Sequence, residues 1–156
     1  MATPFSRHII KILLNLTDHT HRANTMAKLF IQIASLSGML AVILGAFGAH
    51  ALKARLSTDM MGVYETAVQY QFLHSLALLA VGLLAYQLVP SKLLLSSGIA
   101  FTLGIILFSG SLYLLATTEI HHIGSLPVGL ITPVGGLFFI SGWLLLFTST
   151  FNQAFS

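Results

Sequence analysis

The residues of this sequence best suited to chemistry surround His74. Tyr70 and Gln71 precede it by four and three residues, so the three side chains would share one face of a helix. An imidazole can take up and release a proton near neutral pH, which suits a proton relay or contact with a small polar ligand. The same side chains could instead hydrogen-bond to a neighbouring helix and hold it in register. Both interpretations place this face of the helix inside a bundle.

We expect these residues to form one candidate polar cluster with side chains from neighbouring segments. Its members are His50, Glu65, Tyr70, Gln71, His74, Tyr113 and Thr132. At the edge of the cluster, His50 would end a helix, where an imidazole can bind free backbone carbonyls. Glu65 would begin the next helix, where it could pair with His50 or Lys53.

Metal, haem and covalent chemistry are not expected from this sequence. Zinc sites need three or four convergent ligands. The candidate ligands His50, His74, His121 and His122 form no HxxxH pair and no carboxylate–histidine pair on one helix. Cysteine is absent, and so are the G-x-S-x-G, H-E-x-x-H and P-loop motifs. We therefore expect no catalytic residue, no metal and no cofactor.

The elements that must position the cluster are long apolar helices. Of the 156 residues, 56% are hydrophobic and 7% charged, whereas a soluble domain carries roughly a quarter charged residues. Stretches of 20 to 25 residues without Asp, Glu, Lys or Arg cover 29–49, 67–89, 93–117 and 128–147. About 20 helical residues cross a hydrocarbon core of about 30 Å. The sequence predicts an all-α fold, a four-transmembrane-helix bundle with short loops and antiparallel neighbours.

The chain divides into a membrane domain and two short ends. Residues 26–150 would form the four-span domain, and residues 151–156 a short C-terminal tail. Residues 1–25 are an N-terminal extension, either an amphipathic helix at the membrane surface or residues upstream of a true start at Met26. The loops are expected at 51–66, 90–92 and 118–127.

Basic residues in the short loops predict the orientation. On the N-terminal side lie Arg7, Lys11, Arg22, Lys28 and Lys92, against Lys53 and Arg55 on the other. This bias favours a multi-pass protein of the bacterial inner membrane with both termini in the cytoplasm. A start at Met26 would reduce the count to two against two. Seven scattered basic residues predict contact with lipid headgroups and no binding to nucleic acid.

Small residues recur along the first span. Ser37, Ala41, Gly45 and Ala49 are four residues apart, and Gly48 widens the small surface. Such a stripe lets helices approach closely in lipid, within the bundle, against another membrane protein or in a homo-oligomer. In the last span, Pro133 predicts a kink. Trp143 and Phe147 are expected to be interfacial anchors.

Four segments together resemble a known family. They read LGAFGAHALK (44–53), YETAVQYQFLHSLALL (64–79), LFSGSLYLLA (107–116) and ITPVGGLFFISGWLLL (131–146). In this order they are similar to the small membrane proteins called domain of unknown function 423, which include bacterial inner-membrane proteins and transmembrane protein 256. The resemblance covers about 26–147 and implies four spans. It implies no substrate, cofactor or catalytic residue.

Three functional hypotheses follow. The first is a non-enzymatic interaction or accessory component of the membrane, with the lipid bilayer and a second copy or another membrane protein as partners. The second is a small transport or proton-handling protein that uses the polar cluster around His74. The third is a membrane enzyme, which would need His50, Tyr70 and His74 to act together without a recognisable catalytic motif.

Overall fold

The computed structural model describes residues 4–88, 91–118, 122–123 and 126–151, with residues 4–20, 22–23, 122–123 and 126 described by their backbone alone. Within these residues, four helical segments are long and apolar enough to cross a membrane. They are Asn24–Leu52, Thr58–Gln87, Lys92–Thr117 and Val128–Phe151. The predicted all-α, four-span architecture is confirmed.

The helices are interrupted in two places by wider π-helical turns. Helix α1 (Pro4–Phe47) continues into η1 (Gly48–Leu52), and α2 (Thr58–Gln87) follows. The third span consists of α3 (Lys92–Gly104), η2 (Ile105–Ser109) and α4 (Gly110–Thr117). Two short strands, β1 (His122–Ile123) and β2 (Leu126–Pro127), pair antiparallel before α5 (Val128–Phe151). Helix α5 continues through Pro133, where the sequence predicts a kink.

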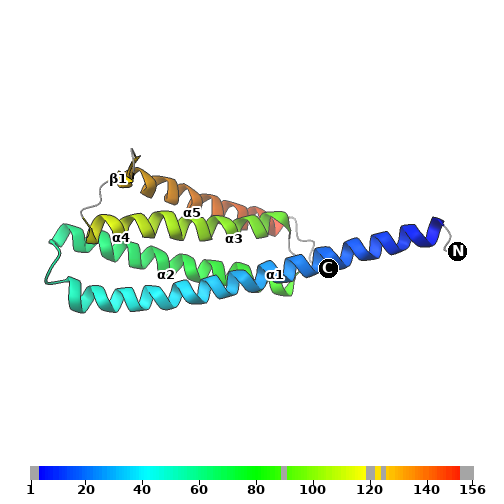
Figure 1. The fold of residues 1–156 in the computed structure, drawn as a ribbon, viewed down its shortest axis with the longest axis horizontal. Helices are drawn as coiled ribbons and strands as arrows, with labels where there is room; N and C mark the ends of the chain where they lie inside the picture. Colours follow the sequence, from blue (N-terminus) through cyan, green and yellow to red (C-terminus); the bar gives the residue numbers. More distant parts are fainter. Residues whose placement is uncertain (1–3, 89–90, 119–121, 124–125, 152–156) are drawn as a thin grey trace.

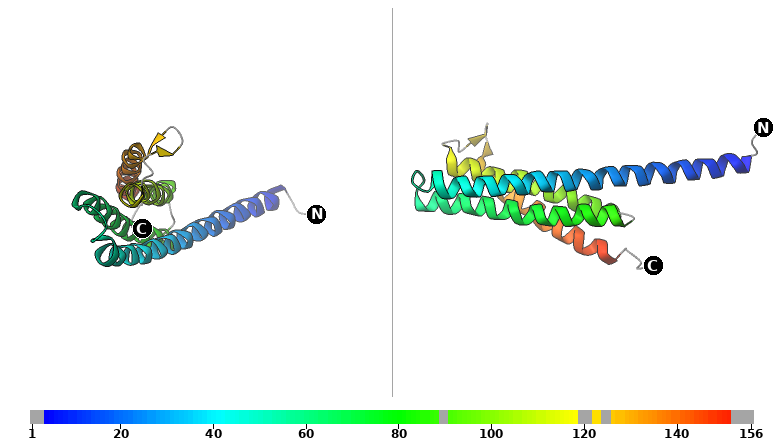
Figure 2. Two further views of the ribbon diagram at one scale, coloured as in Figure 1. Left: turned by 60° about the vertical axis from the view of Figure 1, so that its left-hand side comes forward. Right: turned by 90° about the horizontal axis from the view of Figure 1, so that it is seen from below.

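The four spans stack in the order α1, α2, third span, α5. Helix α2 packs against α1 on one side and against α3 and α4 on the other, and α5 lies on the third span (Figure 1). The N-terminal part of α1 extends well beyond the other helices (Figure 2). Residues 4–25 therefore continue the first span as one helix. Helix α2 thus joins α1 to the third span, and the third span joins α5 to the bundle.

The first loop is much shorter than expected. We expected residues 51–66 to be loop, with a short helix capped by Ser57 inside it. Ser57 does cap a helix, since the Met60 N–H donates to its hydroxyl at 3.3 Å, but that helix is α2 itself, which begins at Thr58. Asp59 lies in the first turn, where a negative charge is favourable. A helix in the headgroup layer can carry charges, so the uncharged stretch underestimates its length. Glu65 consequently lies inside α2.

Phenylalanine rings set against glycines hold the helices together. A Cβ atom on Gly98 would lie 2.5 Å from the Phe30 ring of α1, and one on Gly142 would lie 2.7 Å from the Phe101 ring of α3. Phe101 is fully buried. Lipid provides little hydrophobic drive between helices, so such close contacts supply much of the association. The contact positions are specific to glycine.

Gly135 tests this packing most sharply. A Cβ atom there would collide with the backbone of Phe108, which cannot rotate away as a side chain can. We expect Gly135→Ala to lower the free energy of unfolding by about 1–3 kcal/mol, the range for overpacked cores. Thermal unfolding of the purified protein in detergent measures this. Gly129→Ala is the matched control in the same helix, because nothing lies within 4 Å of its added carbon. Equal melting temperatures for both variants would contradict the packing account.

Candidate functional site

The predicted polar cluster is divided among separate places in the structure. Gln71 and Tyr113 contact each other, and Tyr70 and His74 form part of an aromatic group. Thr132 pairs with Ser111, and the side chains of His50 and Glu65 are exposed. The candidate residues therefore do not converge on one site.

The first group is a hydrogen-bond network centred on Gln71, which is 6% exposed. Its amide nitrogen donates to the backbone carbonyl of Ser37 at 3.0 Å. Its amide oxygen accepts a hydrogen bond from the Tyr113 hydroxyl at 2.8 Å. Ser75 donates to the Gln71 carbonyl at 2.6 Å, and its hydroxyl oxygen lies 2.8 Å from that of Ser37. This Gln71 network, formed by Ser37, Gln71, Ser75 and Tyr113, joins α1, α2 and α4.

His74 has a hydrogen-bond partner at each ring nitrogen. Nδ1 lies 2.8 Å from the Tyr70 carbonyl oxygen, and the Trp143 indole N–H donates to Nε2 at 3.3 Å. A carbonyl can only accept and an indole N–H can only donate, so Nδ1 carries the hydrogen and Nε2 offers its lone pair. This arrangement is satisfied by the neutral imidazole. A doubly protonated ring could not accept the bond from Trp143.

Aromatic rings surround this imidazole. The His74 ring stacks on Phe139 with centroids 3.5 Å apart and planes 13° apart. The remaining rings of this aromatic group are Tyr70, Phe101, Phe108 and Trp143. They come from α2, the third span and α5, so His74 connects three spans. Neutral imidazole packs favourably in such surroundings because its faces contact other π systems.

Two further polar contacts lie toward the first-loop end. The Tyr64 hydroxyl donates to the Leu44 carbonyl at 2.8 Å, and its ring meets the edge of Tyr113 at a centroid distance of 5.2 Å. Thr132 and Ser111 join α5 to α4 through hydroxyl oxygens 2.7 Å apart. Each contact joins two spans, as in the Gln71 network.

The sequence analysis did not single out Tyr64 and did not predict the hydrogen-bond partner of Trp143. Tyr64 shares the buried face of α2 with Ala67, Gln71 and Leu78, and this regular spacing was a signal for it. Trp143 was expected to anchor the interface; its side chain is half exposed, and its indole N–H donates to His74. The two residues are 69 positions apart, and only the folded bundle reveals that they lie at the same depth.

The remaining predicted site residues lie at the surface. His50 is exposed in the π-helical turn η1, and Glu65 is exposed on α2. Among the described residues, no hydrogen bond or ion pair joins Glu65 to His50 or Lys53, or His50 to the helix-end carbonyls. The expected pairing is therefore not formed, because these side chains point outward from their helices.

The small stripe of α1 mostly faces α2. Ala41 is 1% exposed, and a Cβ atom on Gly45 would lie 3.2 Å from the Val68 side chain. Gly48 provides the space for the Tyr64 ring, since an added Cβ would lie 2.5 Å from it. The stripe is thus used mainly inside the bundle, along with Ser37. Ala49 is its exposed member.

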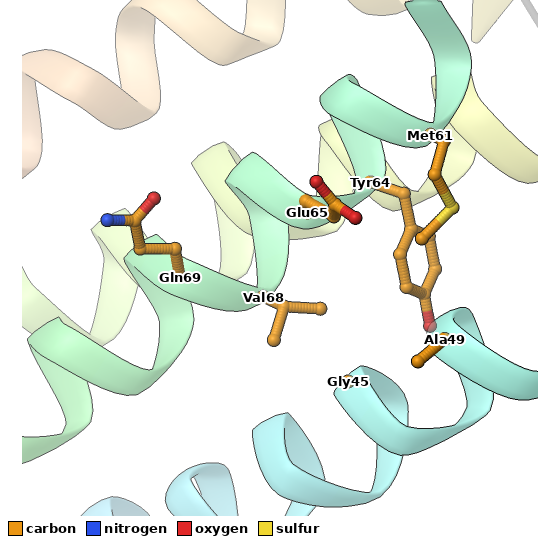
Figure 3. Close-up of a pocket in the computed structure, with 7 residues that line it drawn as sticks. All are labelled: Gly45, Ala49, Met61, Tyr64, Glu65, Val68 and Gln69. Atoms are coloured by element: carbon orange, nitrogen blue, oxygen red, sulfur yellow. The ribbon is translucent and has the colours of Figure 1, made fainter. Parts of the chain in front are cut away.

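A groove opens at the surface where the stripe ends. It has a volume of about 300 Å³ and lies between α1 and α2 near the first loop. Figure 3 shows Tyr64 and Val68 reaching from α2 toward the first span, where Gly45 of α1 and Ala49 of η1 lie. Glu65 provides the acidic group of its lining.

Metal-binding geometry is not found in the described part of the chain. No group of three His, Cys, Asp or Glu side chains there could hold a metal ion. His121 lies outside the described residues, and only the backbone of His122 is described. The buried hydroxyl of Ser109, in η2, is the one buried side-chain polar atom without a partner among the residues described.

Tyr113→Phe tests the contribution of the Gln71 network. The substitution removes one hydroxyl and leaves the buried amide oxygen of Gln71 without its partner. We expect a loss of about 1–2 kcal/mol in the free energy of unfolding, measured by thermal unfolding in detergent. Tyr86→Phe on the exposed face of α2 is the matched control. If both variants melt like the wild type, the network contributes nothing to stability.

Comparison with known proteins gives the family. The family model described as protein of unknown function (DUF423) matches residues 44–136. A UPF0382 membrane protein of Staphylococcus haemolyticus is 46% identical over 125 residues, covering 80% of this chain and 97% of the relative. The UPF0382 membrane protein YwdK of Bacillus subtilis is 40% identical over 119 residues, covering 76% and 93%. No solved structure matches the chain at a significant level. The chain belongs to the DUF423 family, as its resemblance to that family implied.

Proposed function

We propose that this membrane protein is a non-enzymatic interaction or accessory component, which acts through its lipid-facing helices. The observation that supports this most directly is the use of its buried polar groups. The Gln71 network joins α1, α2 and α4, and the bond from Trp143 to His74 Nε2 joins α5 to α2. The other ring nitrogen of His74 is occupied by the Tyr70 carbonyl of the same helix. These groups stabilise the bundle and need no external ligand to be satisfied.

The outer surface supports the same proposal. Only 17% of the most apolar 18-residue segment of α5 is buried, compared with 44% of the corresponding segment of α2. The outward face of α5 carries Leu137, Ile140 and Phe147, each more than half exposed. A helix with so little buried surface contributes a broad face to the surrounding bilayer. That face is available to a second copy of the chain or to another membrane protein.

A proton-handling role is the alternative, and one observation favours it. His74 lies close to the middle of α2, where a titratable side chain is costly and is often functional. Its partner Trp143 is half exposed, so the imidazole is shielded on that side by a single indole. In this alternative, displacement of the indole would open Nε2 to water. An enzymatic role has weaker support, because the acidic residues Asp59 and Glu65 of α2 are exposed and lie two or more helical turns from the buried His74.

We further infer that the protein lies in the bacterial inner membrane with both termini in the cytoplasm. The named relatives are bacterial membrane proteins. Because the number of spans is even, the start of the first span and the end of the last span lie on the same side of the membrane. Lys28 and Lys92 belong to that side, and Lys53 and Arg55 to the other. The orientation then depends on Arg7, Lys11 and Arg22, which add basic charge before the first span.

Site-specific photocrosslinking tests the interaction proposal. Leu137 is replaced by p-benzoylphenylalanine in the full chain, in native membranes, because its side chain is 63% exposed. We expect one discrete protein adduct on illumination, identified by mass spectrometry as a second copy or another membrane protein. Phe139, 3% exposed on the same helix, is the matched control and should give no adduct between chains. Adducts with lipid alone at Leu137 and at Val42 on α1 would contradict the proposal.

Single cysteines test the orientation, because the chain has no cysteine of its own. Arg55→Cys places an exposed thiol in the first loop, and Lys92→Cys places one at the start of α3. In intact cells, we expect a membrane-impermeant maleimide to label Arg55→Cys and to label Lys92→Cys only after the cells are opened. The reverse pattern would place the termini outside the cytoplasm.

A further inference from the structure

The groove between α1 and α2 combines a small-residue wall with an acidic group. Gly45 of α1 and Ala49 of η1 form the first-span side of the groove, where the wall is shallow because their side chains are small or absent. Glu65 and Gln69 lie one turn apart on α2, and both are exposed. Figure 3 shows the Glu65 carboxylate and the Gln69 amide on the α2 side of the groove. The groove thus presents two kinds of oxygen acceptor above an apolar floor.

The depth of this groove matches the boundary between hydrocarbon and headgroups. The 30 residues of α2 extend about 45 Å, and a hydrocarbon core of about 30 Å centred on them leaves Glu65 about 4 Å inside its edge. Gly45 and Ala49 lie in the corresponding last turns of the first span, which ends at Leu52. A molecule in the groove would therefore have its polar end at the headgroup layer and its apolar end in the bilayer.

Glu65 has no partner among the described residues. Its side chain makes no hydrogen bond or ion pair there. A carboxylate at the edge of the hydrocarbon is costly to keep ionised unless a cation or a hydrogen-bond donor meets it. The amide oxygen of Gln69, one helical turn away, can accept a second hydrogen bond. A primary ammonium group has three N–H donors and suits both acceptors, whereas a quaternary ammonium has none.

Basic residues at the same end of the bundle supply the opposite charge. Lys53 follows Ala49 by four residues at the end of η1, and Arg55 lies two residues further. Both side chains are exposed. Neither residue lines the groove, but a carboxylate in the groove and cationic groups at the same end of the bundle complement a zwitterionic headgroup, in which an ammonium group is joined to a phosphate.

We propose that the groove lined by Gly45, Ala49 and Glu65 binds a membrane phospholipid with a primary ammonium headgroup. The ammonium donates to the Glu65 carboxylate and the Gln69 amide oxygen. The phosphate faces Lys53 and Arg55, and the start of one acyl chain lies over Ala49 and Val68. The volume of about 300 Å³ holds the headgroup and only part of a chain. The rest of the lipid remains in the bilayer. This inference does not depend on the proposed partner interaction of α5.

Native mass spectrometry of the full chain tests the proposal. The purified protein is equilibrated with equal amounts of phosphatidylethanolamine, phosphatidylcholine and phosphatidylglycerol with identical acyl chains. We expect the wild type to retain phosphatidylethanolamine about tenfold more than phosphatidylcholine, as for a charge-assisted hydrogen bond. Glu65→Gln should abolish this preference. Ala49→Leu should also abolish it by filling the groove without a change of charge.

Asp59→Asn is the matched control, because it removes a carboxylate from the same helix outside the groove. It should retain the preference, and circular dichroism should show that each variant is folded. Equal retention of the three lipids by the wild type would overturn the proposal. So would an unchanged preference in both Glu65→Gln and Ala49→Leu. A further arm adds dodecylammonium in place of lipid, and Glu65-dependent binding of this amine without a lipid preference would overturn the assignment to phospholipid.

Discussion

The bilayer interior provides no water for a buried polar group, so each one in this bundle needs a partner on a helix. Gln71 meets that requirement most completely. Its amide binds the backbone of α1 through one end and the Tyr113 hydroxyl of α4 through the other. Because α2 lies between those helices, a single side chain fixes their relative height (Figure 1). His74 does the same for α2 and α5, with Trp143 as its partner.

Close packing and polar pairing depend on each other in this structure. The hydrogen bond from Gln71 to the Ser37 carbonyl needs α1 and α2 to approach closely, and small residues permit that approach. Gly48 accepts the Tyr64 ring, whose hydroxyl then reaches the Leu44 carbonyl of the same helix. On the other side of α2, Gly104 leaves space for the Phe139 ring, which covers the His74 imidazole. The glycines therefore determine where polar side chains can bond.

The sequence predicted the spans well and the site less well, for physical reasons. A helix needs a long uncharged stretch to cross the bilayer, so the number of spans could be predicted by counting such stretches. The helix start at Ser57 was accessible from its capping residue, but the continuation of that helix into the second span was not, because charged residues separate Ser57 from the uncharged stretch. Counting residues along the spans placed His50 and Gln71 in the same half of the bilayer. Such a count does not tell which way a side chain points, and the His50 side chain is exposed. The bond from Trp143 required knowledge of which helices are neighbours.

The central claim is that the buried polar groups serve the bundle and do not conduct protons or substrates. Proton flux into liposomes that contain the purified full-length protein and an internal pH-sensitive dye tests this claim most directly. The account predicts that the wild type and His74→Gln give the same rate as liposomes without protein. A flux in the wild type that His74→Gln abolishes, while the variant remains folded, would contradict it and establish His74 as a proton-handling residue.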